Sequence, residues 1–279
     1  MQFADSILKI VSGSNVSKNT SIIKTEGQLM MARGDYGGAL NNFNLILDKE
    51  PGNSYVHFLK GTSYQKIKSL SSAKEELEIA LKQFPEFPFA LVAYAEVLFE
   101  SGDAESGIVQ YNNYFKLKPN DIKAYINYSS FLYANKKYSE SLSIANKILE
   151  LDSKNVSALK IKAYCQYEME NNSEAISSFN NYLILVDTSK TDSKDYEYLG
   201  KLYQKSGNDS LATINFLIAA KSKGARPEFF SETMCYFSKK GKFEEVITIY
   251  KLKSNLYKST SADSYQCGRA LLSVKEYEA

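Results

Sequence analysis

The sequence repeats itself with a period of 34 residues, and this repetition limits the fold more than any other feature does. Gly27 and Gly61 are 34 residues apart, and the same step separates Pro51, Pro85 and Pro119. Repeats of this length start at residues 20, 54, 88, 122 and 156 and, after a three-residue insertion within 186–194, at 193, 227 and 261. A fixed period of this size is typical of arrays in which one supersecondary unit is stacked many times.

The same residue classes recur at the same position of each repeat. Position 8 is small in most repeats: Gly27, Gly61, Ala95, Ser129, Ala163, Gly200 and Gly268, with Met234 as the exception. Position 24 is bulky in most repeats: Phe43, Leu77, Tyr111, Phe179, Phe216 and Tyr250, with Ala145 as the exception. Positions 4, 7, 8 and 11 share one face of a first helix, and positions 17, 20, 24 and 27 share one face of a second. Each repeat is therefore predicted to be an antiparallel helical hairpin whose small positions let the two backbones approach.

A 34-residue helix-turn-helix with this spacing resembles the tetratricopeptide repeat, and the resemblance covers residues 20–279. It implies an all-α fold, an α-solenoid of antiparallel helix pairs coiled into a right-handed superhelix. The sequence departs from the family pattern in two ways. The aromatic residue at position 4 is weakly kept, and the proline that closes a repeat is lost after the third.

This register predicts how the chain is organised. Residues 1–19 are expected to be the remnant second helix of a truncated repeat, with Phe3, Ser6 and Ile10 on its packing face. Residues 20–192 hold repeats 1–5, and residues 193–260 hold repeats 6 and 7. Residues 261–279 hold the first helix and the start of the second helix of a truncated repeat 8, with Tyr277 at position 17. We therefore expect a fragment of a longer repeat protein, with a hinge at the insertion within 186–194.

The resemblance also implies a concave groove lined by positions 2, 5, 9, 12 and 13 of the first helices. In repeats 2–5 these positions hold Tyr55, Phe58, Phe89, Val92, Phe99, Ile126, Tyr133, Tyr164 and Tyr167. Exposed apolar and tyrosine side chains of this kind usually mark a binding surface, which favours a groove for an extended or helical peptide with apolar side chains. The alternative is that some of these aromatic side chains pack against neighbouring first helices.

Repeat 6 differs because it offers a basic station made of Lys194, Lys201 and Lys205, beside Glu197. Such a station could steer an acidic segment or a C-terminal carboxylate, although lysines on a surface are usually only solvated. The clamp by which co-chaperone members of the family hold a terminal carboxylate is disfavoured. Its lysines, asparagines and arginine are not found at the required positions of any three consecutive repeats.

Catalytic chemistry has little support in the sequence. The chain contains no GxxxxGK[ST], HExxH or GxSxG motif and only one histidine, His57, which falls on the packing face of repeat 2. Cys165, Cys235 and Cys267 lie far apart and are expected to act as small buried hydrophobic residues. We expect no enzyme, no metal and no cofactor.

Net charge and hydropathy limit the classes of partner that we expect this chain to bind. With 34 basic and 32 acidic side chains, the net charge of +2 creates no field that would hold nucleic acid. No run of 18 apolar residues is present, so direct membrane insertion is not expected. The expected partner is a protein or peptide, with end-to-end self-association through uncapped terminal helices as a further possibility. The location is open: cytoplasmic by default, or periplasmic or exported if a signal peptide has been removed.

Two functions fit these observations. The first is a non-catalytic scaffold that binds a peptide segment of a partner protein in the aromatic groove. The second is a structural subunit of a larger assembly, such as an envelope or secretion complex, that uses the edges and ends of the repeats.

Overall fold

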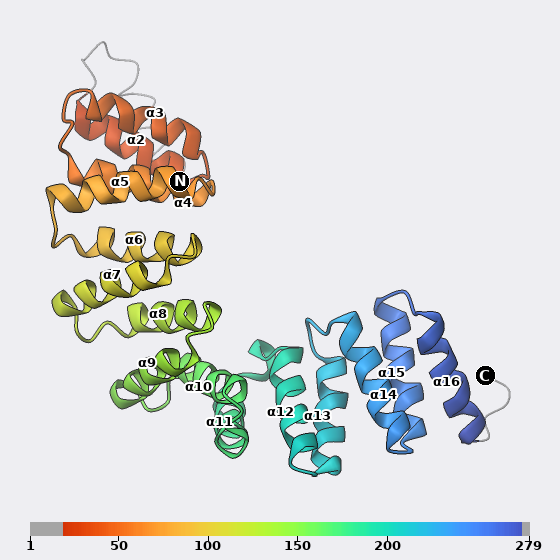
Figure 1. Cartoon of the computed structure of the whole chain (residues 1–279). Helices are drawn as coiled ribbons and strands as arrows, with labels where there is room; N and C mark the ends of the chain where they lie inside the picture. The colour runs from red at the N-terminus through yellow and green to blue at the C-terminus, as the bar shows by residue number, and fades with distance from the viewer. Residues whose placement is uncertain (1–18, 275–279) are drawn as a thin grey trace. The chain divides into compact units, whose positions relative to one another are not determined.

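The structure, a computed structural model, describes residues 19–274, which form fifteen α-helices, one short 3-10 helix and no strand (Figure 1). The chain is thus an all-α solenoid of helix pairs. The expectations for Phe3, Ser6, Ile10 and Tyr277 lie outside the described residues. The right-handed coiling expected of the whole array and the grouping of the repeats into domains stay predictions.

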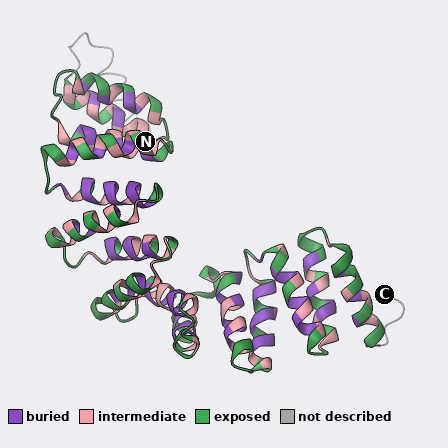
Figure 2. Ribbon diagram, viewed as in Figure 1, coloured by how far each residue is buried: buried purple, intermediate pink, exposed green. Residues whose placement is uncertain are grey.

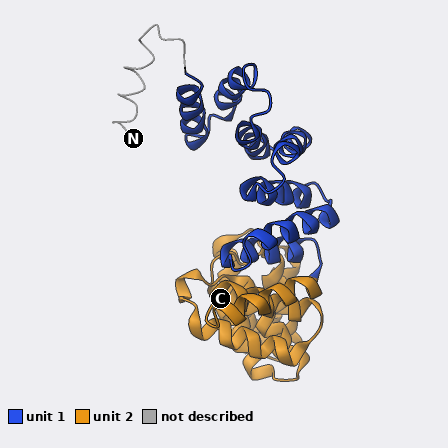
Figure 3. Cartoon of the chain, turned by 90° about the vertical axis from the view of Figure 1, so that its left-hand side faces the viewer, with its two compact units in different colours: residues 1–137 blue, residues 138–279 orange. Residues whose placement is uncertain are grey.

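The chain divides into two compact units, residues 1–137 and 138–279, which Figure 3 shows in two colours. Unit 1 contains α2 (Thr20–Ala32), α3 (Tyr36–Leu47), α4 (Ser54–Lys66), α5 (Leu70–Gln83), α6 (Pro88–Glu100), α7 (Ala104–Leu117) and α8 (Ile122–Ala134). Unit 2 contains α9 (Tyr138–Leu151), α10 (Val156–Glu168), α11 (Asn172–Leu185), η1 (Thr188–Lys190), α12 (Ser193–Lys205), α13 (Asp209–Lys221), α14 (Pro227–Lys239), α15 (Phe243–Leu256) and α16 (Ser261–Ser273).

The even-numbered helices begin at the first residue of each repeat, and local chemistry explains why. The residue before most of these helices carries a side-chain oxygen that accepts a hydrogen bond from the first turn. Asn53 caps the Val56 amide at 3.2 Å, and Asp121 caps the Ala124 amide at 3.0 Å. Repeats 3 and 7 lack such a cap and instead place proline at the first helical position, where its fixed φ favours a helix start.

Small residues at position 8 bring the two helices of a repeat together, as the pattern predicts. A Cβ atom on Gly61 would lie 2.5 Å from Leu77 Cγ, and one on Gly200 would lie 2.6 Å from the ring of Phe216. At Gly61 and Gly200 glycine is therefore required, because the side chain at position 24 crosses the first helix there. Figure 2 shows the resulting buried residues on the faces where helices meet.

A buried carboxylate joins repeat 5 to repeat 6 across the insertion. Asp195, on the first turn of α12, is fully buried and accepts hydrogen bonds from Tyr164 Oη at 2.7 Å and Tyr182 Oη at 3.1 Å. Lys160 Nζ lies 2.9 Å from Asp195 Oδ1. The insertion itself folds into η1, and Asp192 then caps α12. Repeats 5 and 6 are therefore joined by buried side-chain contacts, and the hinge expected at the insertion stays a prediction.

Repeats 7 and 8 are joined in a related way. Asp263, on the first turn of α16, pairs with Lys253 Nζ at 2.6 Å and accepts from Ser231 Oγ at 2.9 Å. Both members of the ion pair are buried. Burial by itself raises the pKa of Asp263, but the hydrogen bonds from Lys253, Thr260 and Ser231 outweigh it and lower that pKa from 3.8 to about 2.

Candidate peptide-binding groove

Five aromatic side chains of unit 1 form a connected cluster, here called the aromatic patch. Its members are Tyr55 and Phe58 of α4, Phe84 and Phe87 of the link between α5 and α6, and Phe89 of α6. Phe87 lies at the centre, with its ring centroid 5.3 Å from Phe58, 5.7 Å from Phe84 and 6.2 Å from both Tyr55 and Phe89. Such separations are favourable for aromatic pairs.

The aromatic patch is open to solvent although it is apolar. Phe89 is 68% exposed, Phe84 is 50% exposed and Tyr55 is 37% exposed, whereas Phe87 is buried beneath them. Tyr55 Oη accepts a hydrogen bond from Gln28 at 2.9 Å, which holds that ring in place. A contiguous group of exposed apolar rings usually marks a surface that interacts with another molecule.

A pocket of about 550 Å³ adjoins the patch and is formed by α4, α6 and α8. Phe58, Phe89 and Val92, three of the residues predicted for the groove, line it. Most of its other first-helix residues also occupy groove positions, because Thr62, Gln65 and Lys66 are at positions 9, 12 and 13 of repeat 2. These side chains, at positions for which the resemblance implies a groove, therefore line one pocket.

The charges of this pocket are mixed. Lys66, Lys118 and Lys123 line it together with Glu96 and Asp121. Burial raises the pKa of Glu96, against the opposing effect of Lys66. Asp121 accepts hydrogen bonds from the Tyr114 hydroxyl at 2.5 Å and from the Ala124 amide in the first turn of α8. These hydrogen bonds lower the pKa of Asp121. Both carboxylates are therefore occupied with contacts inside the protein.

Two residues predicted for the groove lie in the packed interior instead. Phe99 is buried and stacks on Phe131 at 5.4 Å, and its ring would lie 2.8 Å from a Cβ atom on Gly107. Tyr164 is also buried, and its hydroxyl donates a hydrogen bond to Asp195. For these two side chains, the alternative of packing between helices is correct.

The remaining predicted residues are half-buried and do not line the unit 1 pocket. Ile126 and Tyr133 lie on α8. Tyr167 of α10 stacks on Tyr198 of α12, with a centroid distance of 4.0 Å. The structure thus brings together four of the nine predicted groove residues, namely Tyr55, Phe58, Phe89 and Val92.

Two of the three lysines of the predicted basic station pair with carboxylates within unit 2. Lys201 Nζ lies 2.7 Å from Glu197 and 3.4 Å from Glu232. Burial by itself lowers the pKa of Lys201, but these two carboxylates outweigh it, so that pKa is raised. Lys205 Nζ lies 3.8 Å from Glu170. Lys194 Nζ lies 5.0 Å from the ring centroid of Tyr198, within the range of a cation–π contact. Lys201 and Lys205 therefore have carboxylate partners, whereas Lys194 contacts an aromatic ring.

The sequence reasoning missed the central part of the aromatic patch. Phe84 and Phe87 belong to the segment "FPEFPF", which looks like a turn that closes a repeat. The alternation of phenylalanine with proline was an available signal, because proline stiffens a link and so fixes the aromatic side chains on it.

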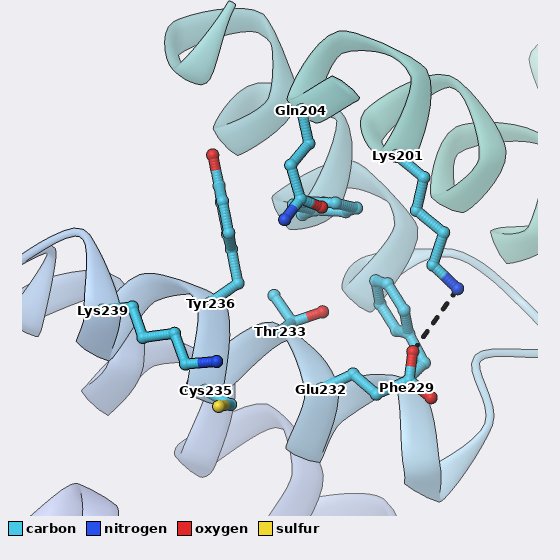
Figure 4. A pocket seen from close by; sticks show the side chains of 9 residues that line it. Lys201, Gln204, Phe229, Glu232, Thr233, Cys235, Tyr236 and Lys239 are labelled. Carbon is cyan, nitrogen blue, oxygen red and sulfur yellow. Dashed lines mark ion pairs between the residues drawn. The ribbon is translucent and has the colours of Figure 1, made fainter. Parts of the chain in front are cut away.

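Two further pockets, both in unit 2, are lined in part by residues at groove positions of their repeats. One of about 220 Å³ lies between α12 and α14 and is lined by Lys201, Glu232 and Cys235, among others (Figure 4). The other, of about 440 Å³, lies between α14 and α16. Cys235 and Lys239 line both pockets.

The residues considered for catalysis have structural contacts. His57 is buried, with Nδ1 2.7 Å from Glu76 and Nε2 2.9 Å from the Pro51 carbonyl oxygen. Cys165 and Cys267 are buried, whereas Cys235 is half-exposed rather than buried as expected. Within residues 19–274 no group of three or more metal-ligating side chains is found, and no helix has the length and apolar character to cross a membrane.

No protein-family profile matches the chain. A TPR repeat-containing protein of Methanocaldococcus jannaschii is 24% identical over 234 residues, which cover 80% of this chain and 40% of that protein. Outer dynein arm-docking complex subunit 4 of Mus musculus is 27% identical over 94 residues, which cover 34% of this chain and 15% of that protein. The chain therefore spans less than half the length of either relative.

Solved structures with a similar fold are tetratricopeptide repeat proteins at low sequence identity. A tetratricopeptide repeat protein from Parabacteroides merdae has a TM-score of 0.64 and 17% identity, over 90% of this chain and 98% of that one. YrrB, described as a TPR protein with an unusual peptide-binding site, has a TM-score of 0.54 and 16% identity, over 64% and 91% of the two chains. With the 34-residue period and the packing at position 8, these likenesses show that the described residues form a solenoid of the tetratricopeptide repeat type.

Proposed function

We propose that the chain is a non-catalytic scaffold that binds a peptide segment of a partner protein on the concave face of α4, α6 and α8. The observation that carries this proposal is the aromatic patch beside a pocket of about 550 Å³. An apolar side chain of the peptide packs against Phe58 and Phe89, while backbone groups face the polar side chains of the pocket. Buried aromatic anchors of this kind supply most of the binding energy in many interfaces.

The comparisons support a partner of this class. YrrB is described as having a peptide-binding site, and another structure with this fold, at a TM-score of 0.55 and 15% identity, is the APC/C hetero-tetramer Cut9–Hcn1. The first of these structures is described by its peptide-binding site, and the second is a complex of different chains. The proposal assigns the same kind of ligand to this chain.

The test uses a random-peptide display library panned against the full chain, followed by affinity measurement with a selected peptide. The Phe89→Ala variant is expected to bind that peptide about tenfold or more weakly, because an anchoring ring is removed. Phe89 is exposed, so its truncation should leave the fold intact. Ile184→Ala removes another exposed apolar side chain, 79% exposed on α11, and serves as the matched control.

Selected peptides should be rich in apolar side chains and should bind Ile184→Ala as they bind the unmodified chain. Equal affinity for Phe89→Ala, or a library that yields no binder, would contradict the proposal. Circular dichroism of both variants checks that the helices remain.

A second candidate function is that of a structural subunit in a larger assembly. Exposed aliphatic side chains on the second helices of unit 2 favour it, notably Ile184, Ile214 and Leu256. The mouse relative is named as a docking-complex subunit. If the chain is such a subunit, Phe89→Ala leaves its association with the other subunits unchanged, whereas a charged residue in place of Ile184 abolishes that association.

A further inference from the structure

The pocket between α14 and α16 carries positive charge without a compensating carboxylate. It is lined by Lys239 at position 13 of repeat 7 and by Arg269 at position 9 of repeat 8. No acidic side chain lines it, and among the described residues neither cation has a carboxylate within ion-pair distance. This differs from Lys201 and Lys205 of repeat 6, which both pair with carboxylates.

Two acidic groups on the helices that form this pocket are already paired with other lysines. Glu232, in the adjoining pocket, lies 3.4 Å from Lys201, as the dashed line in Figure 4 shows. Asp263, on the same helix as Arg269, is buried against Lys253. Among the described residues that line this pocket, Lys239 and Arg269 therefore meet only neutral side chains.

The neutral lining suits a peptide better than it suits a small anion. Tyr265 is 67% exposed and lies beside Arg269, whose guanidinium carbon is 5.9 Å from its ring centroid. Gln266 Oε1 is buried and has no hydrogen-bond partner among the described residues. A buried acceptor without a partner costs free energy, which an N–H donor from a ligand would recover. A backbone amide supplies such a donor next to an acidic side chain.

We propose that this pocket, here called the α14–α16 pocket, binds an aspartate or glutamate side chain of an extended peptide. Lys239 and Arg269 hold the carboxylate from opposite walls, a backbone N–H of the peptide donates to Gln266, and the ring of Tyr265 covers the bound segment. Carboxylate bound by a guanidinium and an ammonium forms charge-assisted hydrogen bonds, which are the stronger kind. The site goes beyond the proposed function, because it uses a different pocket and different residues.

The experiment measures fluorescence anisotropy of a labelled, C-terminally amidated peptide in which Glu alternates with Ala, titrated with the full chain. A peptide with Gln in place of Glu is the matched probe. We expect the Glu peptide to bind, the Gln peptide to bind at least about tenfold more weakly, and the affinity for the Glu peptide to fall between about 50 mM and about 500 mM salt.

Charge reversal identifies the site. In the K239E/R269E double variant the affinity for the Glu peptide should fall by about tenfold or more, because attraction becomes repulsion. Lys221→Glu makes the same type of change at an exposed position of α13 outside the pocket and should leave binding nearly unchanged. The neutral variant K239Q/R269Q repeats the test if the double reversal disturbs folding.

Several results would overturn the proposal. These are no binding of the Glu peptide, equal binding of the Glu and Gln peptides, and full binding by K239E/R269E. Binding of the Glu peptide only when its C-terminal carboxylate is free would also overturn it, because a terminal carboxylate would then be the ligand. Phe89→Ala should leave Glu-peptide binding unchanged, so this inference and the proposed function can fail separately.

Discussion

At the scale of single residues, the turn inside every hairpin has the same backbone conformation. Position 15 has a positive φ in all seven repeats whose turn is described: Gly34, Lys68, Gly102, Lys136, Glu170, Gly207 and Gly241. Glycine adopts this conformation without strain, whereas lysine and glutamate do not. Four repeats therefore carry the residue that the turn requires, and three carry local strain.

This strain predicts a stabilising substitution. Lys136→Gly should raise the free energy of unfolding by about 1 kcal/mol, because φ at this residue is 60° and glycine removes the side-chain clash. Gly102→Ala should lower it by about the same amount, since φ there is 86° and no neighbouring atom adds a packing effect. Urea unfolding followed by circular dichroism measures both. A destabilised Lys136→Gly variant would show that its side chain matters more than its backbone.

Position 8 predicts opposite outcomes for one substitution at two repeats. Gly61→Ala should destabilise by roughly 1 kcal/mol, because overpacking against Leu77 exceeds the gain in helix propensity. Gly268→Ala should stabilise by about 0.5–1 kcal/mol, since no described atom lies within 4 Å of the new Cβ. Thermal unfolding of the two variants gives the signs directly. The same sign in both would refute the packing explanation.

The candidate groove shows what periodicity can and cannot predict about single residues. Phe58, Phe89 and Val92, at positions for which the family resemblance implies a groove, line one pocket. The same implication fails for Phe99, since a glycine at position 20 of repeat 3 leaves room for that ring in the core. Repeat position alone does not give ion-pair partners between repeats, so the contact of Lys201 with Glu232 was not foreseen.

At the scale of the element, the junctions between repeats 5 and 6 and between repeats 7 and 8 share one design. Position 3 of the later repeat is aspartate, and it meets position 27 of the earlier repeat, which is Tyr182 in one case and Lys253 in the other. Elsewhere position 3 is apolar, as with Val56 and Phe229. Two helix starts are thus fixed by charge and hydrogen bonding rather than by apolar packing alone.

The low pKa of Asp263 predicts how this junction responds to acid. A carboxylate whose pKa is lowered by folding stabilises the folded state above its ordinary pKa of 3.8, and this contribution is lost as pH falls towards about 2. The loss should amount to about 2 kcal/mol. Asp263→Asn should be less stable at neutral pH by about 2–4 kcal/mol, because Lys253 then stays buried without a counter-charge.

Urea unfolding at a series of pH values measures this effect. The stability of Asp263→Asn should fall less steeply than that of the unmodified chain between pH of about 4 and about 2. Asp48→Asn changes an exposed aspartate and should keep the unmodified pH dependence. Parallel pH curves for Asp263→Asn and the unmodified chain would argue against a lowered pKa at Asp263.

At the scale of the whole molecule, the period predicted nearly everything about the helices. All eight first helices of the described chain begin where the register puts them, since one packing code repeats along the sequence. The boundary between the two compact units, at residues 137 and 138, was not predicted. It depends on which helices contact one another most, and no local pattern marks it. Because repeats mainly contact their neighbours, the destabilisation by Asp263→Asn should appear in the hydrogen exchange of unit 2 and spare unit 1.

The aspartates at position 3 also mean that the repeats are not interchangeable building blocks. A repeat that starts with such an acid needs a predecessor whose position 27 is polar. If repeat 6 followed repeat 1, the carboxylate of Asp195 would be buried against Ile46, which can offer it no hydrogen bond. Duplication or shuffling of hairpins is therefore permitted at some joints and forbidden at others, so the chain encodes the order of its own repeats.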